Sequence, residues 1–386
     1  MKWFGRKAAP RARPFLFAGF RHAFSGEPWP RSYEAQVREA YLGNPVAQRA
    51  VRLVAESVAW CPVYSSGEEE RASTAPDQVR GRTVSLIPPA LLEAVATQLL
   101  LHGNAFVQVL QDGEGLPAEL FALRPERVTV EADAGGWPAA YLYKVGEAKS
   151  RIPAQDGLGR PGVVHLKSAH PLDDHYGLGC LGAAAAAVAV HNAASRWNKA
   201  LLDNAARPSG ALLYEPGDGA GLSTEQFERL REELETQFSG ADNAGRPLLL
   251  EGGLKWQAMS LTPADMDFVG LKAASAREIA LAFGVPPMLI GLPGDATYAN
   301  YREANRALWR LTVLPMAERI LRGIGDALAS WWPGLRLALD VDQVSALAED
   351  RERLWAQVSR ADFLSDDEKR EMLGFQRGKG SQASVE

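Results

Sequence analysis

The sequence predicts an α+β fold, in which a region of short strands and helices precedes a set of longer helices. β-prone runs separated by glycine-containing turns predict a largely antiparallel sheet at 105–110, 128–131, 140–145 and 163–167. An alanine-rich stretch predicts an unbroken helix at 181–206, and apolar residues at helical spacing predict another at 301–331. Pro315 lies inside that last helix and should kink it, because proline removes the amide hydrogen bond to the carbonyl of Leu311.

Composition places the chain among ordinary globular proteins. Hydrophobic residues make up 46% and charged residues 23% of 386 positions, and the formal net charge is -5. A protein that grips nucleic acid through phosphate contacts is usually basic, so we expect DNA to be held weakly. Only Cys61 and Cys180 are present, which gives no disulfide framework or metal-ligand spacing and fits a reducing cytoplasm. The apolar stretch 180–190 is too short to span a membrane, so no membrane role is implied.

The first half of the chain is predicted to be an exposed basic arm, 1–30, followed by an α+β unit that ends near residue 175. Asn44 and Pro45 are typical of the cap and first position of a helix, which should stop before Pro62. Residues 65–82 are polar and predict a loop. A second helix is expected at 89–101, ended by Gly103.

The second half contains a compact insertion between two long helices. After the helix at 181–206, the pattern predicts a strand, a helix and two further strands at 211–214, 224–238, 247–250 and 255–260. The next helix is expected at 263–283, with Thr262 as its N-cap and a stop at Gly284. A polar loop at 292–300 leads to the kinked helix, and the remaining elements are predicted at 335–341, 345–360 and 366–373.

Histidines and aspartates gather in one short stretch, so a metal site has to be considered. The residues are His165, His170, Asp173, Asp174 and His175. Their spacing lacks the i, i+4 helical pair typical of rigid metal sites, and Pro171 indicates a loop. A polar turn is the preferred interpretation, and a metal-dependent soluble enzyme that uses the turn from His170 to His175 stays open as the alternative. The glycines at 374–380 do not match a phosphate-binding loop, and no nucleophile elbow or zinc-protease motif is present in the sequence.

Four segments of the sequence follow one another in a recognisable order. They are NPVAQRAVRLVAESVAWCPVY at 44–64, LLLHGNAFVQVL at 99–110, VVHLKSAHPLDDHYGLGCLGAA at 163–184 and IALAFGVPPMLIGLPGDATYANYREANRALWRLTVLPMAERI at 279–320. The fourth combines a helix, a Gly-Val-Pro-Pro stop, a polar loop, a Tyr-x-Asn start and a helix broken by proline. This order resembles that of the HK97-type phage portal family over roughly residues 40–375.

The resemblance implies a portal fold with an α/β wing, a two-helix stem, a small α/β clip, a kinked long helix and a short helical crown. The implied boundaries are a flexible N-terminal arm at 1–30, the wing at 31–180, a stem helix at 181–206, the clip at 207–262, a stem helix at 263–284, the tunnel loop region at 285–300, the kinked helix and wing return at 301–344, and the crown and tail at 345–386. Portal proteins of this kind are dodecameric rings that form the channel for DNA packaging and ejection at one capsid vertex. Another head-tail connector component stays open as an alternative.

The resemblance also implies functional residues and partners. The tunnel loop is expected to contain Pro293, Gly294, Asp295, Thr297, Tyr298 and Asn300, and the expected lumen charges of the stem are Lys272 and Arg277. The expected partners are further copies of the chain, double-stranded DNA without sequence specificity, the large terminase, a head-tail adaptor and the major capsid protein. The particle would be that of a phage, prophage or gene transfer agent assembled in the bacterial cytoplasm. We expect no catalytic residue, metal or cofactor.

Overall fold

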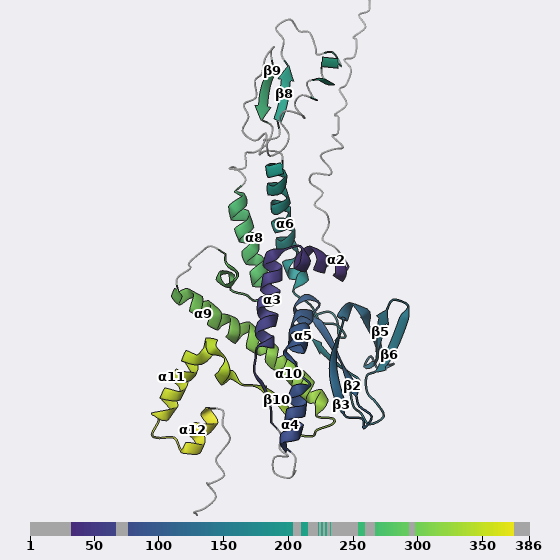
Figure 1. Cartoon of the computed structure of the whole chain (residues 1–386), viewed down its shortest axis with the longest axis vertical. Coiled ribbons are helices and arrows are strands. Elements are labelled where there is room, and N and C mark those ends of the chain that lie inside the picture. The colour runs from purple at the N-terminus through teal and green to yellow at the C-terminus, as the bar shows by residue number, and fades with distance from the viewer. Residues whose placement is uncertain are drawn as a thin grey trace, which may run out of the picture.

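The structure, a computed structural model, describes residues 32–66, 76–203, 210–214, 254–258, 267–292 and 298–373, together with six positions between 223 and 232. Helices α6 (Leu181–Asp203) and α8 (Phe268–Ala282) project together from a larger body (Figure 1). The antiparallel strands β8 (Gly210–Tyr214) and β9 (Leu254–Ala258) lie beyond the far ends of these two helices. The molecule is therefore elongated along the direction of α6.

Helices at the start of the described chain form one side of the body. The bounds are α2 (Tyr33–Val37), the π-helical turn η1 (Arg38–Leu42), α3 (Pro45–Ala59) and α5 (Pro89–Leu101). Asn44 caps α3 as predicted, because its side-chain oxygen accepts hydrogen bonds from the amides of Val46 and Ala47, both at 3.0 Å. The predicted bounds of α5 are confirmed.

The predicted loop at 65–82 is wrong at both ends. Strand β1 (Val63–Ser66) covers its beginning, and α4 (Pro76–Ser85) covers its end, while residues 67–75 lie outside the described part. The sequence of α4, PDQVRGRTVS, has few apolar residues and no helical repeat of them. The spacing of apolar residues therefore does not predict this helix.

Two three-stranded antiparallel sheets confirm the predicted sheet region. In one, β2 (Asn104–Gln111) lies between β3 (Pro117–Leu123) and β7 (Val163–Lys167). In the other, β5 (Pro138–Val145) lies between β4 (Val128–Ala132) and β6 (Ala148–Pro153). β3 and β6 were not predicted, because PAELFAL and AKSRIP contain few β-branched or aromatic residues. The side chains that pack between the two sheets are Phe106, Leu123, Val128, Tyr141 and Val163.

The last strand returns to the beginning of the chain. β10 (Arg336–Leu339), which corresponds to the strand predicted at 335–341, pairs antiparallel with β1. Ala338 lies opposite Tyr64 in this register. The pairing ties the segment after the long C-terminal helices to the end of α3.

The two projecting helices pack side by side along their length. Trp197 of α6 stacks on Phe268 of α8, with ring centroids 4.4 Å apart. α8 is capped by Asp267, whose carboxylate accepts from the amide of Gly270 at 3.1 Å, rather than by the predicted Thr262, and residues 259–266 lie outside the described part. The predicted stop is confirmed, since Gly284 follows α8 with φ +68°, a value that glycine adopts without strain.

The predicted long helix is confirmed as one continuous helical segment, although its middle is widened into a π-helical turn. The bounds are α9 (Tyr298–Leu308), the π-helical turn η6 (Trp309–Val313) and α10 (Leu314–Leu328). Pro315 lies in the first turn of α10, directly after the π-helical turn, and a kink at this point stays a prediction. The helix widens here because proline offers no amide to the carbonyl of Leu311, and its ring crowds that carbonyl.

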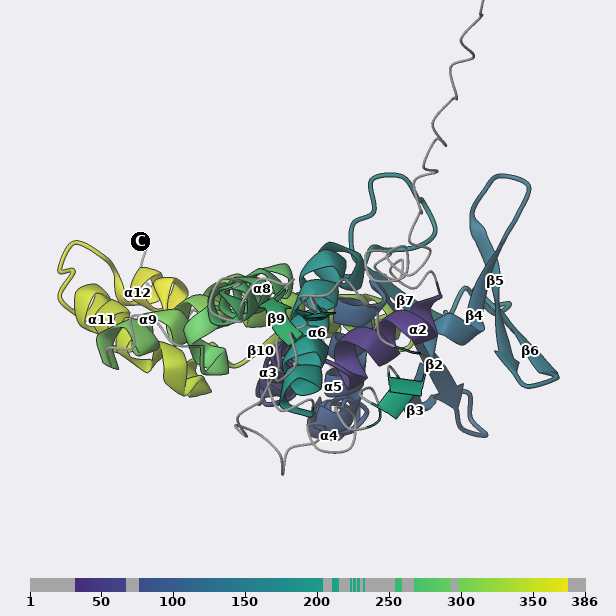
Figure 2. The same cartoon turned by 90° about the horizontal axis from the view of Figure 1, so that it is seen from above.

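Short helices complete the molecule. The bounds are η3 (Pro125–Arg127), η5 (Pro287–Ile290), η7 (Val341–Gln343), η8 (Ser345–Leu347), α11 (Ala348–Ser359) and α12 (Asp366–Met372). Ser365 and Glu368 form a capping box at the start of α12. Seen from above, β5 and β6 lie at one end of the molecule and α11 and α12 at the other, with α6 and α8 between them (Figure 2). The main core is packed around α3, α5 and α10.

Candidate functional site: channel loop and assembly surfaces

A buried polar network fastens α6 to the helices at the start of the body. The side-chain amide of Asn44, a residue only 1% exposed, donates to Oδ1 of Asn192 at 2.8 Å and lies 3.1 Å from Nδ1 of His191. Asn192 in turn donates to the carboxylate of Glu39 at 2.9 Å. Because the Asn44 amide donates to Nδ1, the neutral His191 ring carries its proton on Nε2. Burial, followed by the positive charge of Lys272, lowers the pKa of His191 and so favours this neutral ring.

Glycines let the backbone before α6 cross the end of α5 at close range. A Cβ on Gly177 would lie 2.2 Å from the carbonyl oxygen of Gly103, and a Cβ on Gly179 would lie 2.4 Å from that of Leu101. Asn104 holds the crossing, since its Oδ1 accepts from the amide of Gly177 at 2.7 Å and its amide donates to the carbonyl of Gly177 at 3.1 Å. The Tyr-Gly-Leu-Gly sequence before the helix is therefore needed for close backbone packing.

The two stem charges expected to face a channel have different surroundings in the single chain. Lys272 is half-buried on α8 and lies close enough to α6 for its charge to lower the pKa of His191. Arg277 is exposed on the same helix. The structure therefore places Lys272 toward α6 and leaves Arg277 at the surface.

Most of the predicted tunnel loop lies outside the described residues. This holds for Pro293, Gly294, Asp295 and Thr297. Tyr298 is the first residue of α9, and Asn300 is exposed in its first turn. On the other side, η5 ends at Gly291 with φ +78°. The loop therefore connects the end of a 3₁₀ helix to the start of α9.

Ion pairs join α9 to α11. Arg302 lies 2.8 Å from Glu349, and Arg306 lies 3.1 Å from Glu349 and 3.3 Å from Asp350. Arg310 continues the row at 3.8 Å from Asp350. The side chain of Arg306 is only 13% exposed, so its pairs are shielded from water better than ordinary surface pairs. The helix that follows the predicted tunnel loop is thus joined to α11 by a row of ion pairs.

The histidine-rich turn uses its polar groups within the turn itself. Oδ1 of Asp173 accepts from the amides of His175 at 2.8 Å and Tyr176 at 2.9 Å, and these hydrogen bonds lower the pKa of the Asp173 carboxyl. Nδ1 of His170 accepts from the amide of Leu172 at 3.1 Å. His165 points instead into the space between the sheets, where it stacks on Phe106. Within the described ranges, no three His, Cys, Asp or Glu side chains are grouped so that they could hold a metal ion.

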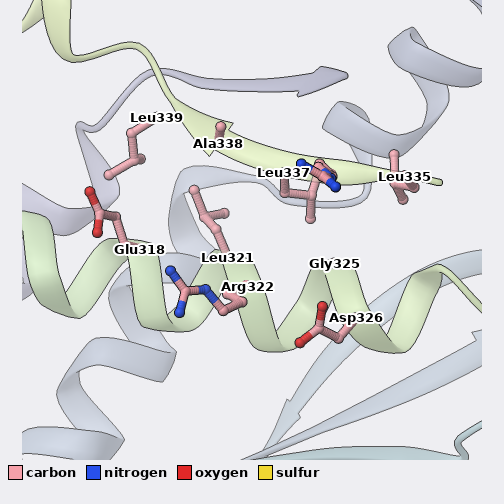
Figure 3. Close-up of a pocket in the computed structure, with 10 residues that line it drawn as sticks. Glu318, Leu321, Arg322, Gly325, Asp326, Leu335, Leu337, Ala338 and Leu339 are labelled. Atoms are coloured by element: carbon pink, nitrogen blue, oxygen red, sulfur yellow. The ribbon is translucent and has the colours of Figure 1, made fainter. Parts of the chain in front are cut away.

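A groove of about 550 Å³ is lined by residues of α10 and of the segment that contains β10 (Figure 3). Leu321 of α10 points toward the strand, and Leu337 and Leu339 of β10 point toward the helix. Charged side chains of Glu318, Arg322 and Asp326 line its α10 side. The groove has an apolar floor and a charged rim, which is the pattern of a protein contact surface.

The network around Asn44, the glycine crossing and the ion pairs of α9 could not be found from sequence patterns. Asn44 was recognised only as a helix cap, and its partner His191 is 147 positions away.

Among helices of the described residues, none is both long enough and apolar enough to cross a membrane.

Known proteins resemble this chain over most of its length. The family model described as Phage portal protein matches residues 45–374. A protein of Rickettsia felis (strain ATCC VR-1525 / URRWXCal2), described as uncharacterized, is 42% identical over 348 residues, which cover 87% of this chain and 88% of that protein.

Two solved structures are similar in both sequence and fold. A chain in the structure of the virion of the native gene transfer agent (GTA) particle is 49% identical, with a TM-score of 0.68 and coverage of 91% of this chain and 95% of that one. A chain in the neck of the native GTA particle, computed with C12 symmetry, is 48% identical, with a TM-score of 0.67 and coverage of 90% and 95%.

Proposed function

The chain belongs to the phage portal protein family, and we propose that twelve copies of it form a ring at one vertex of a phage-like capsid. The ring surrounds the channel through which DNA enters during packaging and leaves during ejection. The observation that carries this proposal is the 49% identity, over 91% of the chain, to a chain of the GTA virion. The same similarity favours a gene transfer agent as the particle type.

The shape of the single chain supports this arrangement. β5 and β6 lie at one end of the body, α11 and α12 lie at the other, and the projecting α6 and α8 stand between them (Figure 2). In the proposed ring, α6 and α8 form the stem, the sheets form the outer wing, and the end that carries the start of α9 faces the channel. Repetition around the axis makes each channel-facing side chain a circle of identical groups.

The proposed channel holds DNA weakly and acts as a valve. A circle of Asp295 would repel the phosphates, whereas circles of Arg277 and Lys272 would attract DNA only within a Debye length of about 8 Å. The net charge of -5 per chain fits such a weak grip. The loop from Pro293 to Asn300 would close against the duplex and prevent packaged DNA from moving back.

The remaining partners are those that membership of the portal family implies. ATP hydrolysis would be supplied by the large terminase, which docks on the clip at 207–262 and is later replaced there by the head-tail adaptor. The major capsid protein would contact the outside of the wing. Assembly would take place in the bacterial cytoplasm before the particle is complete.

Light-scattering mass after size exclusion, followed by negative-stain imaging of the same fraction, tests the ring. We expect a mass of about twelve chains of 41.8 kDa and a central hole. Deleting residues 294–298 should leave the ring intact but reduce the amount of DNA retained by particles after packaging stops. A chain that stays monomeric or dimeric at high concentration, even with terminase and capsid protein added, would contradict the proposal.

A further inference from the structure

The end of α3 carries a highly exposed tryptophan beside a groove. Trp60 is 82% exposed. It lines a groove of about 390 Å³, whose apolar lining also includes Leu53, Pro62, Trp309 and Val344. Aromatic side chains left in water at the edge of an apolar depression are typical of the centre of a protein interface.

An apolar projection lies on the opposite flank of the same segment. Leu311 is 77% exposed and follows Trp309 by two positions in η6. Side chains two positions apart on a helical turn point to opposite sides. A third side of the segment is fixed to the body, because Leu308 is buried and the hydroxyl of Thr312 donates to the carbonyl of Gly284 at 2.7 Å. The turn therefore presents a hollow on one flank and a leucine on the other.

A ring closed by rotation joins two different faces of each chain, and a hollow and a projection on opposite flanks fit such a contact. We propose that Leu311 of one copy inserts into the groove of the next copy, between Trp60 and Trp309. This inference rests on the proposed ring and names a contact that holds its neighbouring copies together.

The exposed area of Trp60 and the polarity of the groove favour a second copy of the chain as the occupant of the groove. The exposed part of Trp60 amounts to roughly 200 Å², about a quarter of the roughly 800 Å² that each partner contributes to a standard interface. The apolar lining is bordered by the polar side chains of Glu56, Ser57, Gln343 and Ser345. An apolar centre with a polar rim is the anatomy of a protein interface.

Paired cysteines test this contact directly in the assembled protein. The chain with Leu311→Cys and Ser345→Cys should give covalent multimers of increasing size, up to the full ring, after treatment with a short bis-maleimide and denaturing electrophoresis. Each single-cysteine variant should stay at the size of one chain. The native thiols interfere little, because burial raises the pKa of Cys61 to about 11 and also raises that of Cys180. Leu158→Cys combined with Ser345→Cys is the matched control, since Leu158, which is 74% exposed, is nearly as exposed as Leu311 but lies in the loop after β6.

The outcomes separate this contact from the ring itself. Rings that are visible by negative stain but give no multimers with the Leu311→Cys and Ser345→Cys pair would overturn the inference and leave the proposed function standing. Covalent dimers without larger species would overturn it too, because they would indicate a two-fold contact. If no ring forms with the unaltered chain, the proposed function fails and the inference fails with it.

A substitution provides a second test that does not depend on crosslinking. Leu311→Asp should raise the concentration at which rings dissociate by at least about tenfold, because it places a charge in the groove. Leu158→Asp should leave that concentration unchanged, and circular dichroism should show that both variants are folded. An unaltered dissociation concentration for Leu311→Asp would refute the proposed insertion.

Discussion

Acidification should destabilise this protein through His165, which is enclosed between its two sheets. The ring of His165 stacks on Phe106 with centroids 4.2 Å apart, and it meets the Tyr141 ring in an edge-to-face arrangement with centroids 5.9 Å apart. Nε2 lies 3.1 Å from Oδ1 of Asn104, which also accepts from the amide of Gly177, so Nε2 is the donor and the neutral ring fits the site. Burial lowers the pKa of His165 to about 4, with smaller contributions from the charges of Lys167, His102 and His175.

The size of the effect follows from the two pKa values. The ordinary value is 6.5 and the folded value is about 4, and this difference corresponds to roughly 3 kcal/mol. Since the folded pKa is the lower one, the unfolded chain binds the proton first as pH falls. The contribution of His165 to the free energy of unfolding is therefore complete above about pH 6.5 and is lost as pH falls toward about 4. Between pH 7.5 and pH 5, we expect a loss of about 2 kcal/mol from this residue alone.

Urea unfolding at a fixed protein concentration, followed by tryptophan fluorescence at pH 7.5 and pH 5, measures this loss. His165→Phe keeps an aromatic ring on Phe106 but cannot be protonated, so its unfolding free energy should fall by about 2 kcal/mol less than that of the unaltered protein. His170→Gln, in the surface turn, serves as the control and should keep the full pH dependence. If His165→Phe and the unaltered protein lose the same stability between these pH values, the assignment of acid sensitivity to this ring is refuted.

Three further predictions concern the contacts around α6 and α9. Gly179→Ala places a Cβ 2.4 Å from the carbonyl oxygen of Leu101 and should lower the free energy of unfolding in urea by about 3 kcal/mol, whereas Gly182→Ala, whose Cβ meets nothing within 4 Å, should not lower it. Asn192→Ala leaves the buried Asn44 amide without its 2.8 Å acceptor and should cost about 2 kcal/mol in the same measurement. Arg306→Gln should speed hydrogen exchange of the α11 amides but not of those in α10, and the difference from the unaltered protein should shrink at high salt. Unchanged exchange in α11 would mean that the ion pairs do not hold it.

Local signals predicted most elements of the fold, because each is complete within a few residues. Asn44 before Pro45 identified the start of α3, and Gly284 before two prolines identified the end of α8. Apolar spacing identified α5 with its observed bounds. In each case, the group that satisfies the backbone lies next to it in the sequence.

The errors have a common physical cause, which is that the stabilising partner is distant in the sequence. α4 has little apolar spacing of its own, and β6 is paired along β5 although its side chains are mostly exposed. The π-helical turn before Pro315 was not predicted either, because the proline indicates that the regular hydrogen bonding is interrupted but not how the backbone accommodates the interruption.

The contacts that fasten α6 and α8 to the body differ, and the difference indicates which of the two helices can move. α6 is held to the body by directional hydrogen bonds of buried groups, including Asn44 and Asn192, and by glycine contacts that leave no space for sliding. α8 is held mainly by apolar side chains, among them Ile279 and Phe283, and such contacts are non-directional. A displacement of α6 must break buried hydrogen bonds, whereas a small shift of α8 need not. In the proposed ring, we therefore expect a movement of these two helices to occur in α8, while α6 stays fixed to the body that carries the sheets.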